Sequence, residues 1–288
     1  MMNLKQTIFK MNKIKLNSLD IELILAHVLK KTREYIIAHP EYKLTKSQIA
    51  KCKLLIKKRV NSLPIAYITG EKEFYGLKFK INKNVLIPRP ETELMVEEAL
   101  KLVASNPQPT TIIDMGTGSG CIIITLAKKI KNCQFFAIDI STKALVIAKQ
   151  NANLNSVVKK IKFIKSNLLE SIINNSKYKL KNSKLIILAN LPYLTPTQIK
   201  NSPSIKYEPK LALTAGLDGL KYYGRLFQQI CALRIARCEL RDINILCEID
   251  PSQTVKIKQM VKRELPKATL QIKKDLSGLN RLVIIKIT

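Results

Sequence analysis

The stretch Asp114-Met-Gly-Thr-Gly-Ser-Gly120 decides the fold class of this 288-residue chain. It ends the apolar run Thr111–Met115 and leads directly into a helical pattern over Cys121–Lys129. Glycines at such a turn let the backbone approach a ligand closely, and the first turn of the helix offers free N–H groups. The stretch therefore predicts a strand, a ligand-binding turn and a helix, as in a nucleotide-type pocket.

Short apolar runs alternate with helical patterns around this stretch. The expected strands are Thr111–Met115, Gln134–Ile138, Ile161–Ile164, Leu185–Ala189, Ile243–Glu248, Thr269–Ile272 and Arg281–Ile287. The clearest helical patterns are Glu91–Val103, Cys121–Lys129, Thr142–Asn153 and Tyr222–Leu240. This alternation predicts an α/β fold with a parallel, doubly wound sheet. No helix separates the last two strands, so we expect them to form an antiparallel pair at the sheet edge.

The chain before this α/β region has a different pattern. Residues 1–64 predict a helical N-terminal domain, in which Asn17 or Ser18, and later Thr45, are placed to cap helices. Residues 65–90 change to an alternating pattern, which predicts a β-hairpin linker. Residues 91–288 then form the expected catalytic domain.

Composition limits the function classes. The chain is 46% hydrophobic and 25% charged, which excludes a disordered, collagen-like or coiled-coil protein. Its apolar runs are shorter than the ~18 residues that span a bilayer, so we expect no membrane association. Six Cys without a CxxC pair, and two His, predict no metal site and fit free thiols in the cytoplasm. The net charge of +29 favours polyanions, but an AT-rich genome produces the same excess of Lys, so it names no ligand.

A second predicted strand ends at Asp139, whose carboxylate can accept hydrogen bonds from both hydroxyls of a ribose. A dinucleotide fingerprint, G-x-G-x-x-G, would place its last glycine at Cys121, whereas this chain has G-x-G-x-G preceded by Asp114. That spacing resembles the first motif of class I S-adenosylmethionine-dependent methyltransferases. It favours a methyltransferase over a dehydrogenase.

The segment Asn190-Leu191-Pro192-Tyr193 ends the fourth predicted strand. It resembles the (Asp/Asn)-Pro-Pro-Tyr signature of methyltransferases that modify a planar NH2 group. The lone pair of such a nitrogen is delocalised, so it is a poor nucleophile. The side-chain oxygen of Asn190 can accept one N–H and a nearby main-chain carbonyl the other, while Tyr193 offers a flat face to the substrate. Adenine, cytosine and a glutamine amide all fit this chemistry.

Three further stretches narrow the choice: Val85–Leu94, Tyr207–Leu213 and Gly216–Leu220. With them, residues 18–288 resemble the release factor glutamine methyltransferases (the PrmC/HemK family). The resemblance implies a Rossmann-like seven-stranded class I methyltransferase domain after a small helical substrate-recognition domain and a β-hairpin. It also implies a protein-(glutamine-N5) methyltransferase that modifies the glutamine of the Gly-Gly-Gln motif of peptide-chain release factors, with S-adenosyl-L-methionine as cofactor.

Carried over residue by residue, the resemblance implies a set of site residues. Cofactor contacts fall on Gly116, Thr117, Gly118, Ser119, Gly120, Asp139, Asn167, Leu168 and Asn190. The glutamine amide falls on Asn190, Leu191, Pro192 and Tyr193, of which Asn190, Pro192 and Tyr193 are the expected catalytic residues. The Pro88–Glu93 block would shape the mouth of the pocket, where Arg89 and Glu91 either contact substrate or pair with each other.

Three departures from the family pattern bear on activity. Leu191 replaces a proline, which leaves φ freer. Asn167 stands where the family commonly has Asp, and its oxygen would accept a hydrogen bond from adenine without charge. Glu248-Ile-Asp-Pro-Ser-Gln253 matches the Glu-Ile-Gly stretch of the family in part, whereas Asp275–Arg281 fits well.

Two alternatives remain open at this point. One is an adenine-N6 methyltransferase of RNA or DNA, favoured by the charge and by Asn190–Tyr193, although no basic nucleic-acid-binding module follows residue 240. The other is a non-enzymatic binding protein. The resemblance to the release factor glutamine methyltransferases instead implies a cytoplasmic monomer. Its partners would be release factors, and direct contact with nucleic acid would not be required.

Overall fold

The computed structural model describes residues 3, 4, 6, 7, 16–105, 108–175, 178, 180, 184–236, 240 and 242–287. The chain divides into two compact units. The first consists of Met1–Glu71 and Pro203–Tyr207, and the second of Lys72–Ser202 and Glu208–Thr288. The hairpin thus falls almost wholly in the second unit. No sequence signal indicated that Pro203–Tyr207 belongs to the first.

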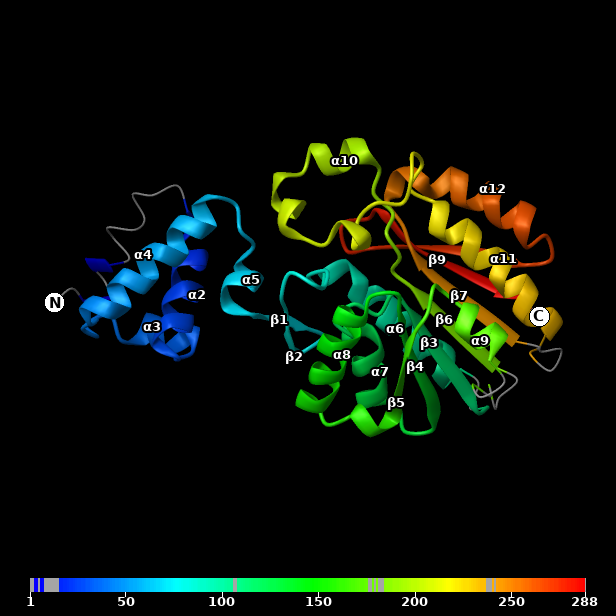
Figure 1. Cartoon of the computed structure of the whole chain (residues 1–288), viewed down its shortest axis with the longest axis horizontal. Coiled ribbons are helices and arrows are strands. Elements are labelled where there is room, and N and C mark those ends of the chain that lie inside the picture. Colours follow the sequence, from blue (N-terminus) through cyan, green and yellow to red (C-terminus); the bar gives the residue numbers. More distant parts are fainter. Residues whose placement is uncertain are drawn as a thin grey trace. The chain divides into compact units, whose positions relative to one another are not determined.

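The first unit is helical (Figure 1). Its helices are α2 (Ser18–Leu29), α3 (Arg33–Ala38), α4 (Lys46–Val60) and α5 (Ile65–Thr69). Asn17 caps α2, and Thr45 forms a capping box at the start of α4, because each side chain accepts a hydrogen bond from a free backbone N–H. A buried aliphatic cluster joins the helices, and an Arg59–Asp20 ion pair of 2.8 Å ties α4 to α2. The hydroxyl of Tyr207 donates to the carbonyl of Asn61, which attaches the later segment to this unit.

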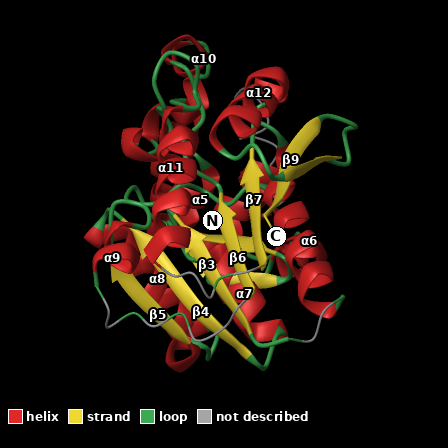
Figure 2. Ribbon diagram, turned by 90° about the vertical axis from the view of Figure 1, so that its right-hand side faces the viewer, coloured by secondary structure: helices red, strands yellow, loops and turns green. Residues whose placement is uncertain are grey.

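The second unit contains one mixed sheet (Figure 2). Within the described residues its strand order is β5-β4-β3-β6-β7-β9-β8. The strands are β3 (Thr110–Met115), β4 (Cys133–Asp139), β5 (Ile161–Lys165), β6 (Lys184–Ala189), β7 (Asp242–Glu248), β8 (Thr269–Lys274) and β9 (Asn280–Ile287). The five strands from β5 to β7 are parallel, whereas β9 is antiparallel to both β7 and β8. The predicted antiparallel pair of β8 and β9 at the sheet edge is confirmed. The last strand of the chain, β9, lies between β7 and β8.

Helices cover both faces of this sheet, which explains why β3 and β6 are buried along their whole length. The helices are α6 (Glu93–Ala104), α7 (Cys121–Lys129), α8 (Thr142–Leu154), α9 (Glu170–Asn174), α11 (Lys221–Ala236) and α12 (Thr254–Glu264). On one face, α9, α11 and α12 share a core cluster with Ile113 and Met115 of β3. On the other face, α7 contacts both α6 and α8. No helix of the described residues is long and apolar enough to cross a membrane.

The strand order reverses between β3 and β6. From β3 the chain proceeds outward to β4 and β5, then returns to place β6 on the other side of β3. Loops that leave adjacent strands in opposite directions open a crevice at the carboxyl ends of those strands. Met115 lies opposite Ala189 in the β3–β6 pair, so the glycine stretch and the Asn190 stretch both begin at this crevice.

Side chains of Glu93, Asn151 and Asn155 hydrogen-bond the backbone of the hairpin, and Asn151 makes the most contacts. The hairpin consists of β1 (Glu71–Phe74) and β2 (Leu77–Lys80). Asn151 on α8 accepts a hydrogen bond of 2.6 Å from the N–H of Lys80 and donates to the carbonyls of Lys80 and Ser119. A single side chain therefore fixes both the hairpin and the glycine turn.

We expect Asn151→Ala to lower the free energy of unfolding of this unit by about 3 kcal/mol, because the N–H and carbonyl of Lys80 and the carbonyl of Ser119 lose their hydrogen-bond partner. Urea unfolding followed by circular dichroism measures the change. Asn153→Ala is the matched control, since Asn153 is exposed on the same helix. Equal stability of the two variants would contradict the anchoring role.

Candidate active site

The turn after β3 has the backbone conformation that its glycines predict. Gly116, Gly118 and Gly120 have φ values of +67°, +55° and +82°. A Cβ atom at Gly120 would lie 2.7 Å from Cδ1 of Ile124 and 3.3 Å from Cβ of Ala148, so this position requires glycine for close packing of α7 and α8. The expected turn and helix are confirmed.

Asp114, near the end of β3, stabilises this turn through a hydrogen bond with Thr117. Its buried carboxyl accepts a 2.6 Å hydrogen bond from the hydroxyl of Thr117, whose N–H donates to the carbonyl of Ile138. Burial raises the pKa of Asp114 to about 7, against the opposing effect of the Thr117 hydroxyl. Asp114 and Thr117 thus shape the turn and do not line the cavity described next.

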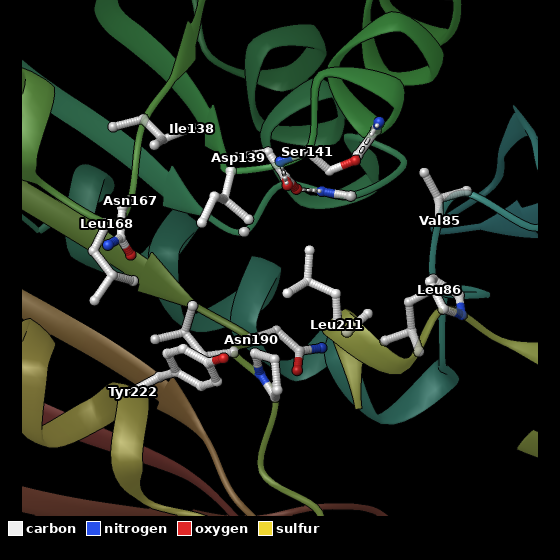
Figure 3. Close-up of a pocket in the computed structure, with 18 of the residues that line it drawn as sticks. Val85, Leu86, Ile138, Asp139, Ser141, Asn167, Leu168, Asn190, Leu211 and Tyr222 are labelled. Atoms are coloured by element: carbon white, nitrogen blue, oxygen red, sulfur yellow. Dashed lines mark hydrogen bonds between the residues drawn. The ribbon is translucent and has the colours of Figure 1, made fainter. Parts of the chain in front are cut away.

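A cavity of about 140 Å³ opens at the crevice (Figure 3). Eight of the predicted site residues line it: Gly116, Gly118, Asp139, Asn167, Leu168, Asn190, Leu191 and Pro192. Asp139 and Ser141 lie on one side of the cavity and Asn190 on another, with Leu168 and Tyr222 between them. The sequence motifs therefore converge although Gly116 and Pro192 are 76 positions apart in the chain.

Asp139 is fixed at the end of β4. One carboxylate oxygen accepts a 2.9 Å hydrogen bond from the N–H of Gly118, and the other accepts a 2.8 Å hydrogen bond from the N–H of Ser141. Burial raises its pKa, although these backbone donors oppose the shift. Each oxygen keeps a lone pair, so the carboxylate can still accept hydrogen bonds from two hydroxyl groups.

Asn167 and Leu168 form another wall of the cavity. The side-chain NH2 of Asn167 donates to Glu170 over 2.9 Å, which leaves its oxygen as an acceptor. Leu168 is buried and has a φ of +54°, a conformation that is rare for a residue with a branched side chain. Its strained backbone at a cavity wall is typical of a ligand-binding position.

Asn190 follows β6 and has a fixed orientation. Its Nδ2 donates a hydrogen bond of 3.1 Å to the hydroxyl of Thr92, so its Oδ1 remains free to accept. Leu191, which stands in place of proline, is 4% exposed, and its side chain lies against Gly116. The loop that carries the Asn190 amide therefore lies directly beside the glycine turn.

Tyr193 has a different place from the one predicted. It does not line the cavity; its ring packs against the core, and its hydroxyl donates to Oε1 of Glu248 over 3.1 Å. Its carbonyl accepts a 2.8 Å hydrogen bond from Gln253, and burial raises the pKa of its hydroxyl. A Cβ atom at Gly219 would lie 2.1 Å from this carbonyl, so glycine is required there. Tyr193 thus holds the loop in position.

Two other carbonyls of this region are also occupied. The buried hydroxyl of Tyr223 on α11 contacts the carbonyl of Ala189 at 3.1 Å and hydrogen-bonds the carbonyl of Glu248. The carbonyl of Leu194 accepts from the N–H of Ala215. These contacts hold the end of β6 and the far end of the loop that follows it.

The Pro88–Glu93 block contributes differently from the expectation. Arg89 pairs with the buried carboxylate of Glu208, not with Glu91, so the predicted Arg89–Glu91 pair is wrong. Glu208 also accepts a hydrogen bond from the N–H of Ile87, which joins the block to the stretch before Leu211. Neither Arg89 nor Glu91 lines the cavity. Glu208 is the acidic residue of the stretch Tyr207–Leu213. Its distance from Arg89 in the sequence gives no indication that the two residues pair.

The remaining predicted cofactor residues lie beneath the cavity surface. Ser119 is 3% exposed and its carbonyl accepts from Asn151, while Gly120 begins α7. Sequence reasoning missed several lining residues, among them Val85, Leu86, Ser141, Leu211 and Tyr222. Val85, Leu86 and Leu211 belong to the stretches that carry the family resemblance, but their residue types alone do not indicate that they line a cavity.

The cavity fits S-adenosylmethionine better than a dinucleotide. Its described lining contains the carboxylate of Asp139 and no Lys or Arg, so no side-chain charge there would neutralise a pyrophosphate. Ile138, Ile140, Leu168 and Tyr222 form an apolar slot that suits a purine ring, beside the free oxygen of Asn167. In the described part of the chain, no group of three or more His, Cys, Asp or Glu side chains could hold a metal ion.

The sheet order, the glycine turn and the cavity at the strand ends define a class I methyltransferase. The sequence matches the models of a PrmC N-terminal domain over residues 5–70 and of a methyltransferase domain over residues 108–209. Among solved structures, the hMettl16 catalytic domain in complex with MAT2A 3′UTR hairpin 1 has a TM-score of 0.58 at 15% identity, covering 92% of this chain and 90% of that one. The likeness shows the fold.

The chain belongs to the release factor glutamine methyltransferase family. It is 34% identical to the release factor glutamine methyltransferase of Thermodesulfovibrio yellowstonii, over 96% of this chain and 94% of the relative. It is 40% identical to that of Flavobacterium psychrophilum, over 69% and 68% of the two chains. It also matches the bifunctional methyltransferase of Rickettsia typhi at 34% identity, but spans about half the length of that protein.

The raised pKa of Asp114 predicts a pH-dependent stability. An ordinary Asp in the unfolded chain loses its proton near pH 4, whereas Asp114 in the folded chain keeps it to about pH 7. Between these values the folded state binds more protons, so its stability falls as pH rises. The difference between these two pKa values limits the loss of stability to at most about 4 kcal/mol.

Asp114→Asn removes this dependence and keeps an oxygen for Thr117. We expect the stability of the wild type relative to Asp114→Asn to decline between about pH 4 and 7 and then to level off. Urea unfolding of both proteins at several pH values tests this. Parallel stability curves would show that Asp114 titrates normally.

Proposed function

We propose that the chain transfers a methyl group from S-adenosylmethionine to the side-chain amide nitrogen (N5) of the glutamine in the Gly-Gly-Gln motif of peptide-chain release factors. The observation that carries the proposal is the fixed amide of Asn190 at the cavity. Its NH2 is committed to Thr92, so its oxygen is the group that meets an incoming planar NH2. The family of the chain supports release factors as the substrate.

Several residues of the cavity would have a role in this reaction. When bound, S-adenosylmethionine supplies a methyl group activated by a positively charged sulfur. Asp139 would hold the ribose hydroxyls, and Asn167 would accept a hydrogen bond from the adenine amino group. The glycine turn allows the backbone to lie close to the ligand. No basic side chain of the described lining would repel the cationic cofactor.

Asn190 would orient the glutamine amide. Its oxygen accepts one N–H of the substrate, and a main-chain carbonyl within Asn190–Pro192 accepts the other. Both hydrogen bonds keep electron density on the substrate nitrogen and direct its lone pair along the transfer axis. Because the leaving group is already activated, positioning contributes more than a strong base. The apolar walls, including Leu211 and Pro192, would exclude water.

The first unit would recognise the release factor, because its sequence matches the PrmC N-terminal domain. We place the reaction in the cytoplasm, where release factors act, with the chain as a monomer. A planar exocyclic amine of adenine fits the chemistry of Asn190 equally well. An assay of the proposal therefore includes nucleic acid as a second substrate.

The test is mass spectrometry of a release factor incubated with the protein and S-adenosylmethionine. We expect a gain of about 14 Da, one methylene, on the tryptic peptide that contains Gly-Gly-Gln. A release factor with Glu in place of that glutamine is the control and should stay unmodified. Methylation of RNA or DNA without modification of the release factor would overturn the proposal in favour of an adenine-N6 methyltransferase.

We expect Asn190→Ala to reduce kcat by at least about 100-fold, because the substrate amide loses its acceptor. Its affinity for S-adenosylmethionine should stay within about twofold of the wild type, since the glycine turn and Asp139 are unchanged. Single-turnover kinetics and calorimetry measure the two quantities. Retained turnover would show that another group orients the amide.

We expect Asn167→Ala to raise the Kd for S-adenosylmethionine about tenfold, because one hydrogen bond to the adenine amino group is lost. Calorimetry measures the affinity, and Asn153→Ala on the exposed face of α8 is the control. An unchanged Kd would place the adenine elsewhere in the cavity.

A further inference from the structure

The segment after the amide loop (residues 190–193) leaves that loop and comes back to it. We call it the returning loop (residues 195–213). The N–H of Leu194 donates to the carbonyl of Leu213 over 3.0 Å, and the N–H of Ala215 donates to the carbonyl of Leu194 over 3.2 Å. These two hydrogen bonds form a parallel bridge at the base of the returning loop. Both of its ends are therefore fixed beside the amide loop.

The middle of the returning loop and its last part belong to different compact units. Pro203–Tyr207 belong to the first unit, whereas Glu208 and the residues after it belong to the second. The chain also passes from one unit to the other after Glu71 and after Ser202. The peptide bond between Tyr207 and Glu208 is thus a further covalent connection between the two units.

Tyr207 and Glu208 are each held by their own unit. The hydroxyl of Tyr207 donates a 2.8 Å hydrogen bond to the carbonyl of Asn61, which caps the C-terminal end of α4. The carboxylate of Glu208, a residue that is 4% exposed, accepts a 3.2 Å hydrogen bond from the N–H of Ile87 and pairs with Arg89. Two adjacent residues therefore carry one anchor in each unit.

The part of the returning loop that follows Glu208 forms a wall of the cavity. Pro209, Leu211 and Ala212 line the cavity, and Figure 3 shows Leu211 there. Leu86 lines it as well, and the residue after Leu86 donates the N–H that Glu208 accepts. Glu208 therefore holds two segments of the cavity lining together.

The returning loop is stiff. It contains Pro196, Pro203 and Pro209 and no glycine. Each proline ring fixes φ, which leaves the backbone fewer ways to absorb a displacement. Its helix α10 (Pro196–Lys200) begins with a capping box, which stabilises the first turn. The loop therefore transmits a restraint from its middle to the cavity wall.

We propose that the returning loop couples the first unit to the cavity, with Tyr207 as the positioning residue. This inference rests on the proposed function, in which the first unit recognises a release factor. A factor bound to that unit restrains it and, with it, Tyr207. Glu208 then holds residues 209–212 in the position that surrounds the cofactor. The complete release factor, and not a short peptide that contains Gly-Gly-Gln, is the substrate for which the cavity is ordered.

Coupling of this kind acts in both directions. A ligand in the cavity orders residues 209–212, and this restraint reaches the carbonyl of Asn61 through Glu208 and Tyr207. The N–H groups of residues 61–63 donate to carbonyls of α4, so their hydrogen exchange reports on the end of this helix. Binding in the cavity should therefore be detectable in the first unit without a release factor.

The first test measures hydrogen exchange by mass spectrometry with and without saturating S-adenosylmethionine. We expect the cofactor to slow exchange at residues 61–63 by at least about twofold in the wild type. It should have no such effect in Tyr207→Phe, which lacks the hydroxyl that binds Asn61. Tyr42→Phe is the matched control, because Tyr42 packs against the core of the same unit, and it should respond like the wild type.

The second test compares a complete release factor with a short peptide that contains Gly-Gly-Gln. Tyr207→Phe should lower kcat/KM for the factor by about tenfold and leave the lower kcat/KM for the peptide unchanged, because the peptide does not engage the first unit. In the wild type, a bound factor should lower the Kd for S-adenosylmethionine by about fivefold. Tyr207→Phe should lose this effect, while its Kd without the factor stays within about twofold of the wild type.

Two results would contradict the coupling. One is slowed exchange at residues 61–63 in Tyr207→Phe to the same degree as in the wild type, and the other is an equal loss of kcat/KM with factor and peptide. If the wild type left release factors unmodified but showed the slowed exchange, and Tyr207→Phe abolished it, the proposed function would be refuted and the coupling would stand. Modification of the factor without slowed exchange in the wild type would refute the coupling alone.

Discussion

The pairing of β3 with β6 is the constraint on which the site depends. Parallel hydrogen bonding puts Met115 opposite Ala189, so the glycine turn and Asn190 leave the sheet side by side. A shift of one residue in this register would move the side chains of the shifted strand to the opposite face of the sheet. Helix layers on both faces prevent that shift, because each face carries apolar side chains that must stay covered.

The amide loop is held by side chains more than by its own backbone. The signature of this class has two prolines, and here the first is Leu191. Tyr223 hydrogen-bonds the strand end, Gln253 binds the carbonyl of Tyr193 and Glu248 binds its hydroxyl. Leu191 itself packs against Gly116. These contacts restrict the loop from outside, which compensates for the φ freedom that the missing ring allows.

The chain as a whole is strongly basic, whereas the lining of the cavity is not. The chain has a net charge of +29, yet the described cavity lining contains no basic residue and one carboxylate. The excess of Lys therefore says nothing about the bound ligand. The lining does, because a cationic cofactor and a neutral amide substrate both suit a pocket without fixed positive charge.

The sequence by itself determined where the strands lie along the chain, the two helix-capping signals, the glycine turn and the residue types of the amide loop. These follow from local rules: apolar periodicity, backbone freedom at glycine and the hydrogen-bonding chemistry of an Asn side chain. Only the tertiary structure decided that Tyr193 faces the core, that Arg89 pairs with Glu208 and that Thr92 holds Asn190. The partners in each of these contacts are 55, 119 and 98 residues apart, and a local pattern carries no information about which distant group will satisfy a buried polar atom.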